Sequence, residues 1–238
     1  MLFGTSGNSN PKLKMMAVQF VHQIIYNCPE HRLSPIGAVI LSALTRLVNE
    51  EKDNAKLRGS CYVAIGKLGL KLPSLVNKDV SMIQTFFDAM STEDRDTQMS
   101  VQEALGLMAP AFRQIEPHNL KFIEAIVATY IEKEECQVRL VAVQYAGEVF
   151  SHDNVATRYT LLLGAGDMKD EVCAASRASL YAGMRKANKE DHAPRARKDD
   201  PAPGAILPDF LEILTYVMDK SAIRLKSSYK VGMGSVEL

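Results

Sequence analysis

The sequence predicts an all-α protein, an α-solenoid of stacked helical hairpins, from three observations. One pattern of small and apolar residues occurs five times along the 238 residues. Within each copy, the apolar positions follow the i, i+3, i+4 spacing that places side chains on one face of a helix. No stretch alternates with period two for long enough to compete as a β-strand.

The clearest copy lies in residues 136–150, CQVRLVAVQYAGEVF. Its columns are spaced by four, three, one and three residues and hold Val138, Ala142, Tyr145, Ala146 and Val149. The three upstream copies hold Leu13, Ala17, Phe20, Val21 and Ile24; then Leu57, Cys61, Ala64, Ile65 and Leu68; then Thr97, Val101, Ala104, Leu105 and Met108. The downstream copy holds Val172, Ser176, Ser179, Leu180 and Gly183.

The intervals between copies indicate the kind of repeat. The first columns lie 44, 40, 41 and 34 residues apart. All but the last suit a two-helix repeat of the HEAT or armadillo type, whose period is roughly 40 to 47 residues. The fifth copy is the weakest, because its serines and glycine bury less apolar surface.

The expected organisation has five parts. Residues 1–10 form a disordered tail rich in Gly, Ser and Asn, and residues 11–186 form the array of about five HEAT-like repeats. Residues 187–204 mix both charges with three prolines and predict a flexible loop. A further solenoid helix is expected over 205–220, and residues 221–238 form a loose tail.

Helix boundaries follow from proline positions and apolar faces. Pro11, Pro35 and Pro117 are expected at first helical positions, where their missing N–H costs nothing. The expected pairs are 11–27 with 35–50, 55–70 with 78–90, 97–112 with 117–131, and 137–150 with 155–164, followed by a helix over 170–186.

Small residues within the columns should let neighbouring helices approach closely. Ala64, Gly66, Ala104, Ala142 and Ala146 are the positions expected to serve this purpose. A solenoid helix packs against the helices before and after it, so stability arises at interfaces between repeats. The chain begins and ends on apolar helices, which suggests an internal piece of a longer array.

Composition argues against several classes of partner. Lys plus Arg equals Asp plus Glu at 28 each, so no global charge would attract nucleic acid or an anionic membrane. The sequence shows neither a secretion signal nor a membrane span. The four cysteines, which lack paired spacing, are expected as reduced thiols of the cytosol or nucleus: Cys28, Cys61, Cys136 and Cys173.

No constellation of residues predicts catalysis, a cofactor or a metal. The five histidines are scattered, and no HExxH, GxSxG, GxGxxG or phosphate-binding loop motif occurs. Zinc could be considered from Cys136 or Cys173 with His152, but no pair has ligand spacing. The glycines at 164–166 fit the end of a helix better than a phosphate loop.

Two sets of residues raise the question of partner binding. Arg58 and Arg139 directly follow the first-column residue of their copies, as do Lys14, Gln98 and Cys173. They could line a binding ridge, but surface residues pairing with acidic side chains of adjacent repeats are the favoured interpretation. Basic residues at 195–198 could be a nuclear-import motif, although a solvated loop is favoured. No partner-binding residue is assigned.

Several segments resemble a known family. They are LRGSCYVAIGKLGLKLP at 57–73, SPIGAVILSALTRLVNE at 34–50, SVQEAL at 100–105, QVRLVAVQYAGEVF at 137–150 and RYTLLLGAGD at 158–167. They resemble the large HEAT-repeat proteasome adaptor and scaffold proteins, the proteasome-associated Ecm-type family. The likeness covers most of residues 11–186.

The resemblance implies a non-catalytic scaffold that binds the proteasome. Its partners would be the core and regulatory particles, which it would link during proteasome assembly, quality control or localisation. It implies a place in cytoplasm and nucleus, with links to endomembranes through partners. The alternative is a nuclear-transport or trafficking adaptor that binds cargo peptides or a small GTPase. An enzyme has no support from any residue constellation.

Overall fold

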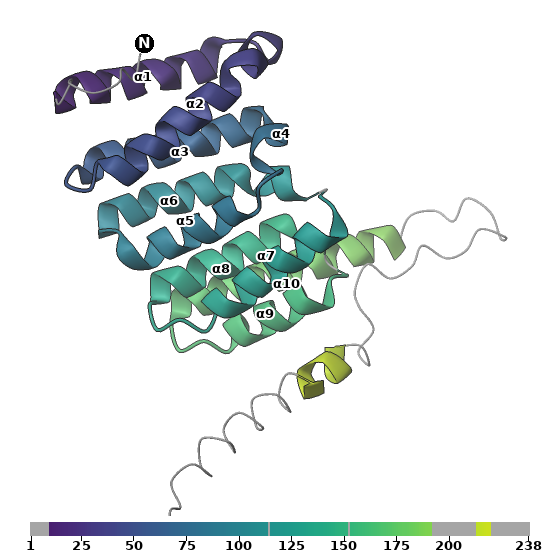
Figure 1. The fold of residues 1–238 in the computed structure, drawn as a ribbon. Coiled ribbons are helices and arrows are strands. Elements are labelled where there is room, and N and C mark those ends of the chain that lie inside the picture. The colour runs from purple at the N-terminus through teal and green to yellow at the C-terminus, as the bar shows by residue number, and fades with distance from the viewer. Residues whose placement is uncertain (1–9, 114, 152, 192–212, 220–238) are drawn as a thin grey trace, which may run out of the picture. The chain divides into compact units, whose positions relative to one another are not determined.

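The computed structural model describes residues 10–113, 115–151, 153–191 and 213–219. Its regular elements over these residues are all helices, so the all-α prediction is confirmed for this part of the chain (Figure 1). The chain divides into two compact units, Met1–Val149 and Phe150–Leu238.

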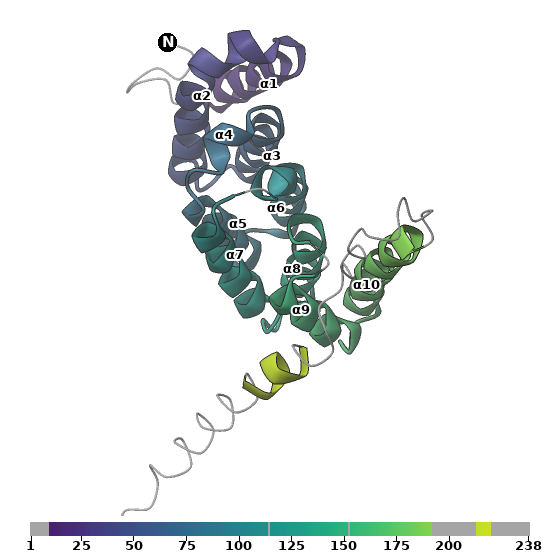
Figure 2. The ribbon, with the colours of Figure 1, turned by 90° about the vertical axis from the view of Figure 1, so that its right-hand side faces the viewer.

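The first unit is a two-layer stack of helices (Figure 2). One layer contains α1 (Pro11–Asn27), α3 (Ala55–Lys71), α6 (Arg95–Met108) and α8 (Cys136–Val149). The other contains α2 (Glu30–Glu50), α4 (Pro73–Val76), α5 (Ser81–Thr92) and α7 (Pro117–Tyr130), with the 3₁₀ turn η1 (Ala109–Phe112) after α6. Within its layer α3 packs on both α1 and α6, as expected for a solenoid helix.

The repeated columns form the core of this unit. In the second, third and fourth copies every column residue is buried, including the polar Thr97, which is 1% exposed. In the first copy, Leu13 is 48% exposed and Phe20 is 52% exposed. No described helix covers that side of α1, so only some of the column residues of the first copy are buried.

The predicted close approach of helices occurs between α3 and α6. A Cβ atom built on Gly66 would lie 2.6 Å from the Cα of Ala104. One built on Gly59 would lie 2.9 Å from Oγ of Ser100. Since Cβ atoms do not approach other atoms this closely, glycine lets these two helices pack backbone to backbone.

The expected start of the second helix is wrong. The structure begins α2 at Glu30, with Pro29 as the N-cap residue, and places Pro35 inside the helix. Leu33 is fully buried and anchors the first turn, which offsets the hydrogen bond that Pro35 removes. Glu30 in the first turn also favours the positive end of the helix dipole.

Other helix boundaries in the first unit differ from the predicted ones, and the differences occur at prolines. Pro73 begins the short helix α4, which the sequence analysis missed, and the next helix starts at Ser81 instead of residue 78. Pro110 ends α6 as an α-helix at Met108, and the chain continues as a 3₁₀ turn to Phe112. The remaining helices lie within a residue or two of their expected bounds.

The second unit contains α9 (Val155–Ala165) packed against α10 (Asp170–Asp191). Within the fifth copy, Val172 and Ser176 are fully buried, whereas Ser179 and Leu180 are half-buried. Residues 187–191, which were expected in the loop, belong to α10, because the helix runs to Asp191 through the sequence KANKE.

Part of the expected 205–220 helix is observed, over residues 213–219, where Tyr216 contacts Tyr159 with ring centroids 5.4 Å apart. The tail at 1–9, the loop residues 192–204, residues 205–212 and 220, and the tail at 221–238 lie outside the described residues.

Candidate functional site

The described residues do not assemble a reactive cluster. No group of three His, Cys, Asp or Glu side chains within them could hold a metal ion. Cys136 and Cys173 are free thiols, and His152 lies outside the described residues. Burial raises the pKa of the Cys61 thiol to about 12, so this cysteine is a protonated core residue. No described helix has the length and apolar character needed to cross a membrane.

In the second to fifth copies, the residue that directly follows the first column closes the end of the preceding helix. Arg58 Nη1 donates to the carbonyl of Glu51 at 3.0 Å and to that of Lys52. Gln98 Nε2 donates to the carbonyls of Met90 at 2.9 Å and Glu93 at 3.0 Å. These carbonyls lie at the C-terminal end of the preceding helix, where no intrahelical donor is available.

The later copies repeat the arrangement. Arg139 Nη1 donates to the carbonyls of Lys133 at 2.9 Å and Glu134 at 2.7 Å. Within the second unit, Cys173 Sγ lies 3.2 Å from the carbonyl oxygen of Ala165. A donor at this position therefore satisfies carbonyls at the end of the preceding helix, and a binding ridge is not needed to explain these residues.

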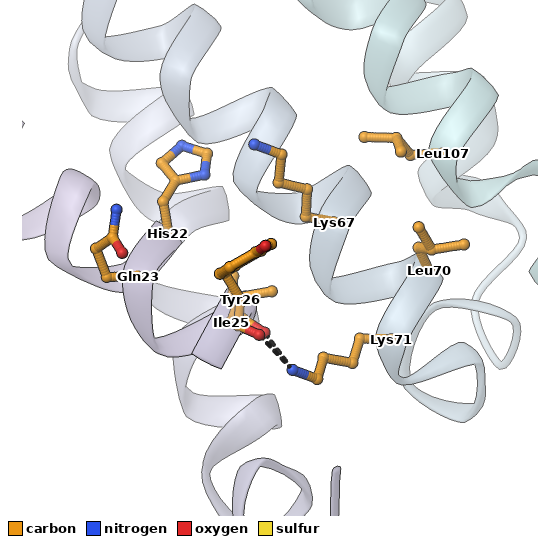
Figure 3. A pocket seen from close by; sticks show the side chains of 8 residues that line it. All are labelled: His22, Gln23, Ile25, Tyr26, Lys67, Leu70, Lys71 and Leu107. Carbon is orange, nitrogen blue, oxygen red and sulfur yellow. Dashed lines mark hydrogen bonds between the residues drawn. The ribbon is translucent and has the colours of Figure 1, made fainter. Parts of the chain in front are cut away.

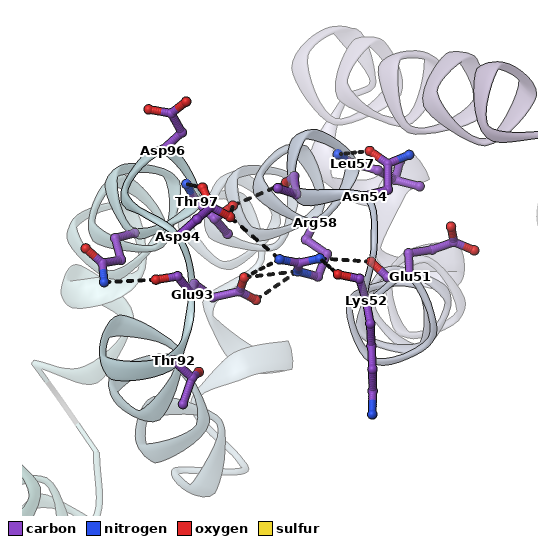
Figure 4. Close-up of polar contacts among 12 residues, drawn as sticks. Glu51, Lys52, Asn54, Leu57, Arg58, Thr92, Glu93, Asp94, Asp96 and Thr97 are labelled. Carbon is purple, nitrogen blue, oxygen red and sulfur yellow. Dashed lines mark hydrogen bonds and ion pairs between the residues drawn. The ribbon is translucent and has the colours of Figure 1, made fainter.

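Arg58 also makes the predicted pairing with an adjacent repeat (Figure 4). Its Nε lies 3.0 Å from both carboxylate oxygens of Glu93, and its Nη2 lies 2.5 Å from Oε2. Hydrogen bonding to Glu93 raises the pKa of Arg58 above its ordinary value. Arg58 Nη2 also lies 3.7 Å from Oδ2 of Asp94, the N-cap residue of α6 in the next repeat, which confirms the predicted pairing for Arg58. Lys14 pairs with Glu51, at the end of the other helix of its own repeat, so its partner is not in an adjacent repeat.

An open groove of about 670 Å³ lies where the C-terminal halves of α1 and α3 face each other (Figure 3). From α1 it is lined by His22, Gln23, Ile25 and Tyr26. From α3 and α6 it is lined by Lys67, Leu70, Lys71 and Leu107. The groove is therefore mostly apolar, with two lysines on one wall.

His22 is the titratable group beside this groove. Its Nε2 lies 3.1 Å from the carbonyl oxygen and 3.2 Å from the hydroxyl oxygen of Ser60, while its Nδ1 is buried without a partner among the described residues. Burial, and then the positive charge of Lys67, lower the pKa of His22 below 6.5. The imidazole is therefore neutral at pH 7, and the charges of the groove are those of the lysines.

No sequence pattern by itself predicts this groove. Lys67 and Lys71 are four residues apart on one helix, with Leu70 between them. That spacing places both charges on one face beside an apolar side chain. This spacing was the only sequence signal for the groove. The facing residue Tyr26 lies more than forty positions away and shares no local pattern with these lysines.

Two layers of paired helices, with side chains that close helix ends and a groove between repeats, define a helical-repeat solenoid. Residues 1–164 match the family described as "Proteasome component ECM29, N-terminal". The chain belongs to this family.

Two curated relatives extend the comparison. The chain is 37% identical over 237 residues, 100% of its length, to the human protein named "Proteasome adapter and scaffold protein ECM29". It is 22% identical over 211 residues, 80% of its length, to the Drosophila melanogaster "Proteasome-associated protein ECM29 homolog". It spans 12% and 11% of the lengths of these relatives. No solved structure matches the chain.

Proposed function

We propose that this chain is a segment of a non-catalytic scaffold that binds the proteasome. The observation that carries the proposal is family membership, together with a human relative whose name specifies a proteasome adapter and scaffold. The solenoid supports it physically, because stacked repeats present a long surface on which several partners can be held. Within this function, the scaffold links the core and regulatory particles and contributes to proteasome assembly, quality control or localisation.

The proposal includes where in the cell the scaffold acts and that it acts by binding. We place the scaffold in cytoplasm and nucleus, with endomembrane association through its partners. We propose that this scaffold acts by binding and not by catalysis, in keeping with the human relative that is named an adapter and scaffold. A transport adaptor, the alternative function, gains no support from the relatives, whose names specify the proteasome.

Crosslinking mass spectrometry of the full-length protein on purified proteasomes tests this function. We expect exposed lysines of the first unit, such as Lys12, Lys56 and Lys121, to crosslink to proteasome subunits. Free full-length protein mixed with the proteasome in high salt is the control, because surface contacts weaken there. Crosslinks from other regions of the protein, with none from this segment, would overturn the proposal.

A further inference from the structure

We propose that the groove between α1 and α3 binds an extended peptide segment in which an acidic side chain neighbours a large apolar one. The groove would bind such a segment whichever assembly the solenoid serves. Its volume of about 670 Å³ lies within the roughly 300–1,000 Å³ of pockets that bury small ligands. That is room for a few side chains rather than for a folded domain.

Exposed apolar side chains in the groove favour the binding of an apolar group. Tyr26 is 83% exposed and Leu70 is 49% exposed, and they lie on opposite walls (Figure 3). Ile25, which is 3% exposed, and the half-buried Leu107 continue this lining. Covering large apolar side chains that otherwise face water is favourable in proportion to the area removed. An apolar side chain of a peptide would lie between Tyr26 and Leu70.

The charge of the groove selects an acidic occupant. Lys67 is exposed, and it makes no ion pair within 4.0 Å among the described residues. Lys71 Nζ lies 2.5 Å from the carbonyl of Ile25 and 3.1 Å from that of Tyr26, which fixes its charge at the end of α1. Glu103 on α6 is the acidic group near enough to influence His22. Two lysines against one carboxylate, with His22 neutral, leave a positive groove that complements an acidic side chain.

The donors present favour a peptide over a free anion. Binding of phosphate needs several converging N–H groups. Here the Lys71 ammonium is bonded to backbone carbonyls, and His22 Nε2 faces Ser60. Gln23 accepts a hydrogen bond from Asn27 through Oε1 at 3.2 Å. Its amide N–H groups have no acceptor among the described residues and suit a peptide carbonyl. An amphipathic helix would need a longer apolar groove with several successive anchors.

A random dodecapeptide phage library, panned against the whole 238-residue chain, tests the proposal. We expect enriched peptides to carry Asp or Glu next to Leu, Phe, Tyr or Trp. For the best synthetic peptide, measured by fluorescence anisotropy, Lys67→Glu should weaken binding about tenfold, because an attraction becomes a repulsion. Leu70→Asp should weaken it at least as much. Lys56→Glu, an equal charge change on the same helix outside the groove, should leave affinity unchanged.

Several results would overturn the proposal. They are enrichment of no peptide, enrichment of peptides without acidic residues, and equal affinity for the parent and Lys67→Glu chains. Displacement of the peptide by millimolar inorganic phosphate would identify a simple anion site instead. Since Lys67 and Leu70 are exposed, both variants should keep the parental circular dichroism spectrum. If either fails to do so, Lys67→Ala and Leu70→Ser repeat the comparison with the same expected direction.

Discussion

Arg58 and Glu93 form a two-pronged ion pair between consecutive repeats, with side chains only 11% and 12% exposed. Arg58 belongs to α3, whereas Glu93 is the C-cap residue of α5 in the turn that leads to α6. The third guanidinium nitrogen donates to the carbonyl of Glu51 after α2. One side chain therefore joins the ends of helices from two repeats, and its planar fork suits this better than a lysine would.

Arg58→Ala should lower the free energy of unfolding by about 2 kcal/mol, because it leaves the nearly buried Glu93 carboxylate without its charge partner and the part-buried Glu51 carbonyl without this donor. The midpoint of urea unfolding, followed by circular dichroism, measures this loss. Arg58→Lys should recover only part of it.

Arg46→Ala is the matched control for this prediction. The Arg46–Glu50 pair spans 3.8 Å with side chains 47% and 57% exposed. A pair this exposed contributes roughly 0.2–1 kcal/mol at most. Equal losses for Arg46→Ala and Arg58→Ala would contradict the role assigned to Arg58.

Gly66→Ala should destabilise the protein by about 1–3 kcal/mol. The new Cβ would stand 2.6 Å from the Ala104 backbone, so α3 and α6 would have to separate. Gly106→Ala, on α6, meets nothing within 4 Å and should stabilise by about 0.5–1 kcal/mol, since alanine favours the helix. Thermal unfolding of both variants checks the signs. An unchanged melting temperature for Gly66→Ala would show that these helices do not pack at this position.

The contrast between two column residues shows what periodicity can predict. Leu57 and Leu13 occupy the same column, yet Leu57 is fully buried and Leu13 is 48% exposed. Spacing identifies the face of a helix that is apolar, but burial also requires a neighbouring helix, which a single segment does not encode. The columns were therefore right for the second to fourth copies and only partly right for the first.

Local signals failed where tertiary packing opposed them. Ser34-Pro35 has the sequence of a helix start, but burial of Leu33 extends α2 to Glu30. The groove was missed for a related reason, because Tyr26 and Leu70 belong to helices of different repeats. For Arg58 the sequence predicted a structural role through pairing with acidic side chains. Its bonds to the carbonyls at the end of the preceding helix were not predicted, because the sequence does not show where that helix ends relative to α3.

Tyr145→Phe should leave stability unchanged or raise it slightly. The Tyr145 hydroxyl is buried and finds no hydrogen-bond partner among the described residues, and burial raises its pKa well above 10.0. Removing a buried, unpaired polar group costs nothing in hydrogen bonds, and the ring keeps its edge-on contact with Phe87 at 5.6 Å. The urea midpoint is the measurement.

Tyr130→Phe is the counterpart with a partner. The Tyr130 hydroxyl donates to Asp88, and its ring also contacts Phe87 at 4.9 Å. Loss of a hydrogen bond to a carboxylate should cost about 1.5 kcal/mol. A larger loss for Tyr145→Phe than for Tyr130→Phe would mean that the Tyr145 hydroxyl has a partner after all.

His22 should make the protein less stable at acidic pH. Burial and the nearby charge of Lys67 lower its pKa in the folded state below 6.5, whereas the unfolded chain keeps the ordinary value. As pH falls through 6.5, the unfolded state binds a proton at His22 more readily than the folded state does. The stability that the neutral His22 side chain contributes is therefore complete above that pH and declines below it. Urea midpoints from about pH 8 to about pH 5 should fall less steeply for His22→Gln than for the parent.

Lys67→Met separates the two causes of this dependence. Removing the ammonium group removes the effect of the Lys67 charge on the pKa of His22, while the effect of burial remains. The fall of the urea midpoint with pH should therefore be intermediate between those of the parent and His22→Gln. The charge of Glu103 raises the pKa of His22 and so opposes the two causes that lower it. Glu103→Gln should therefore make the decline in stability with falling pH steeper. Identical pH profiles for the parent and His22→Gln would show that the imidazole gains its proton as easily in the folded chain as in the unfolded one, and that it is not held neutral beside the groove.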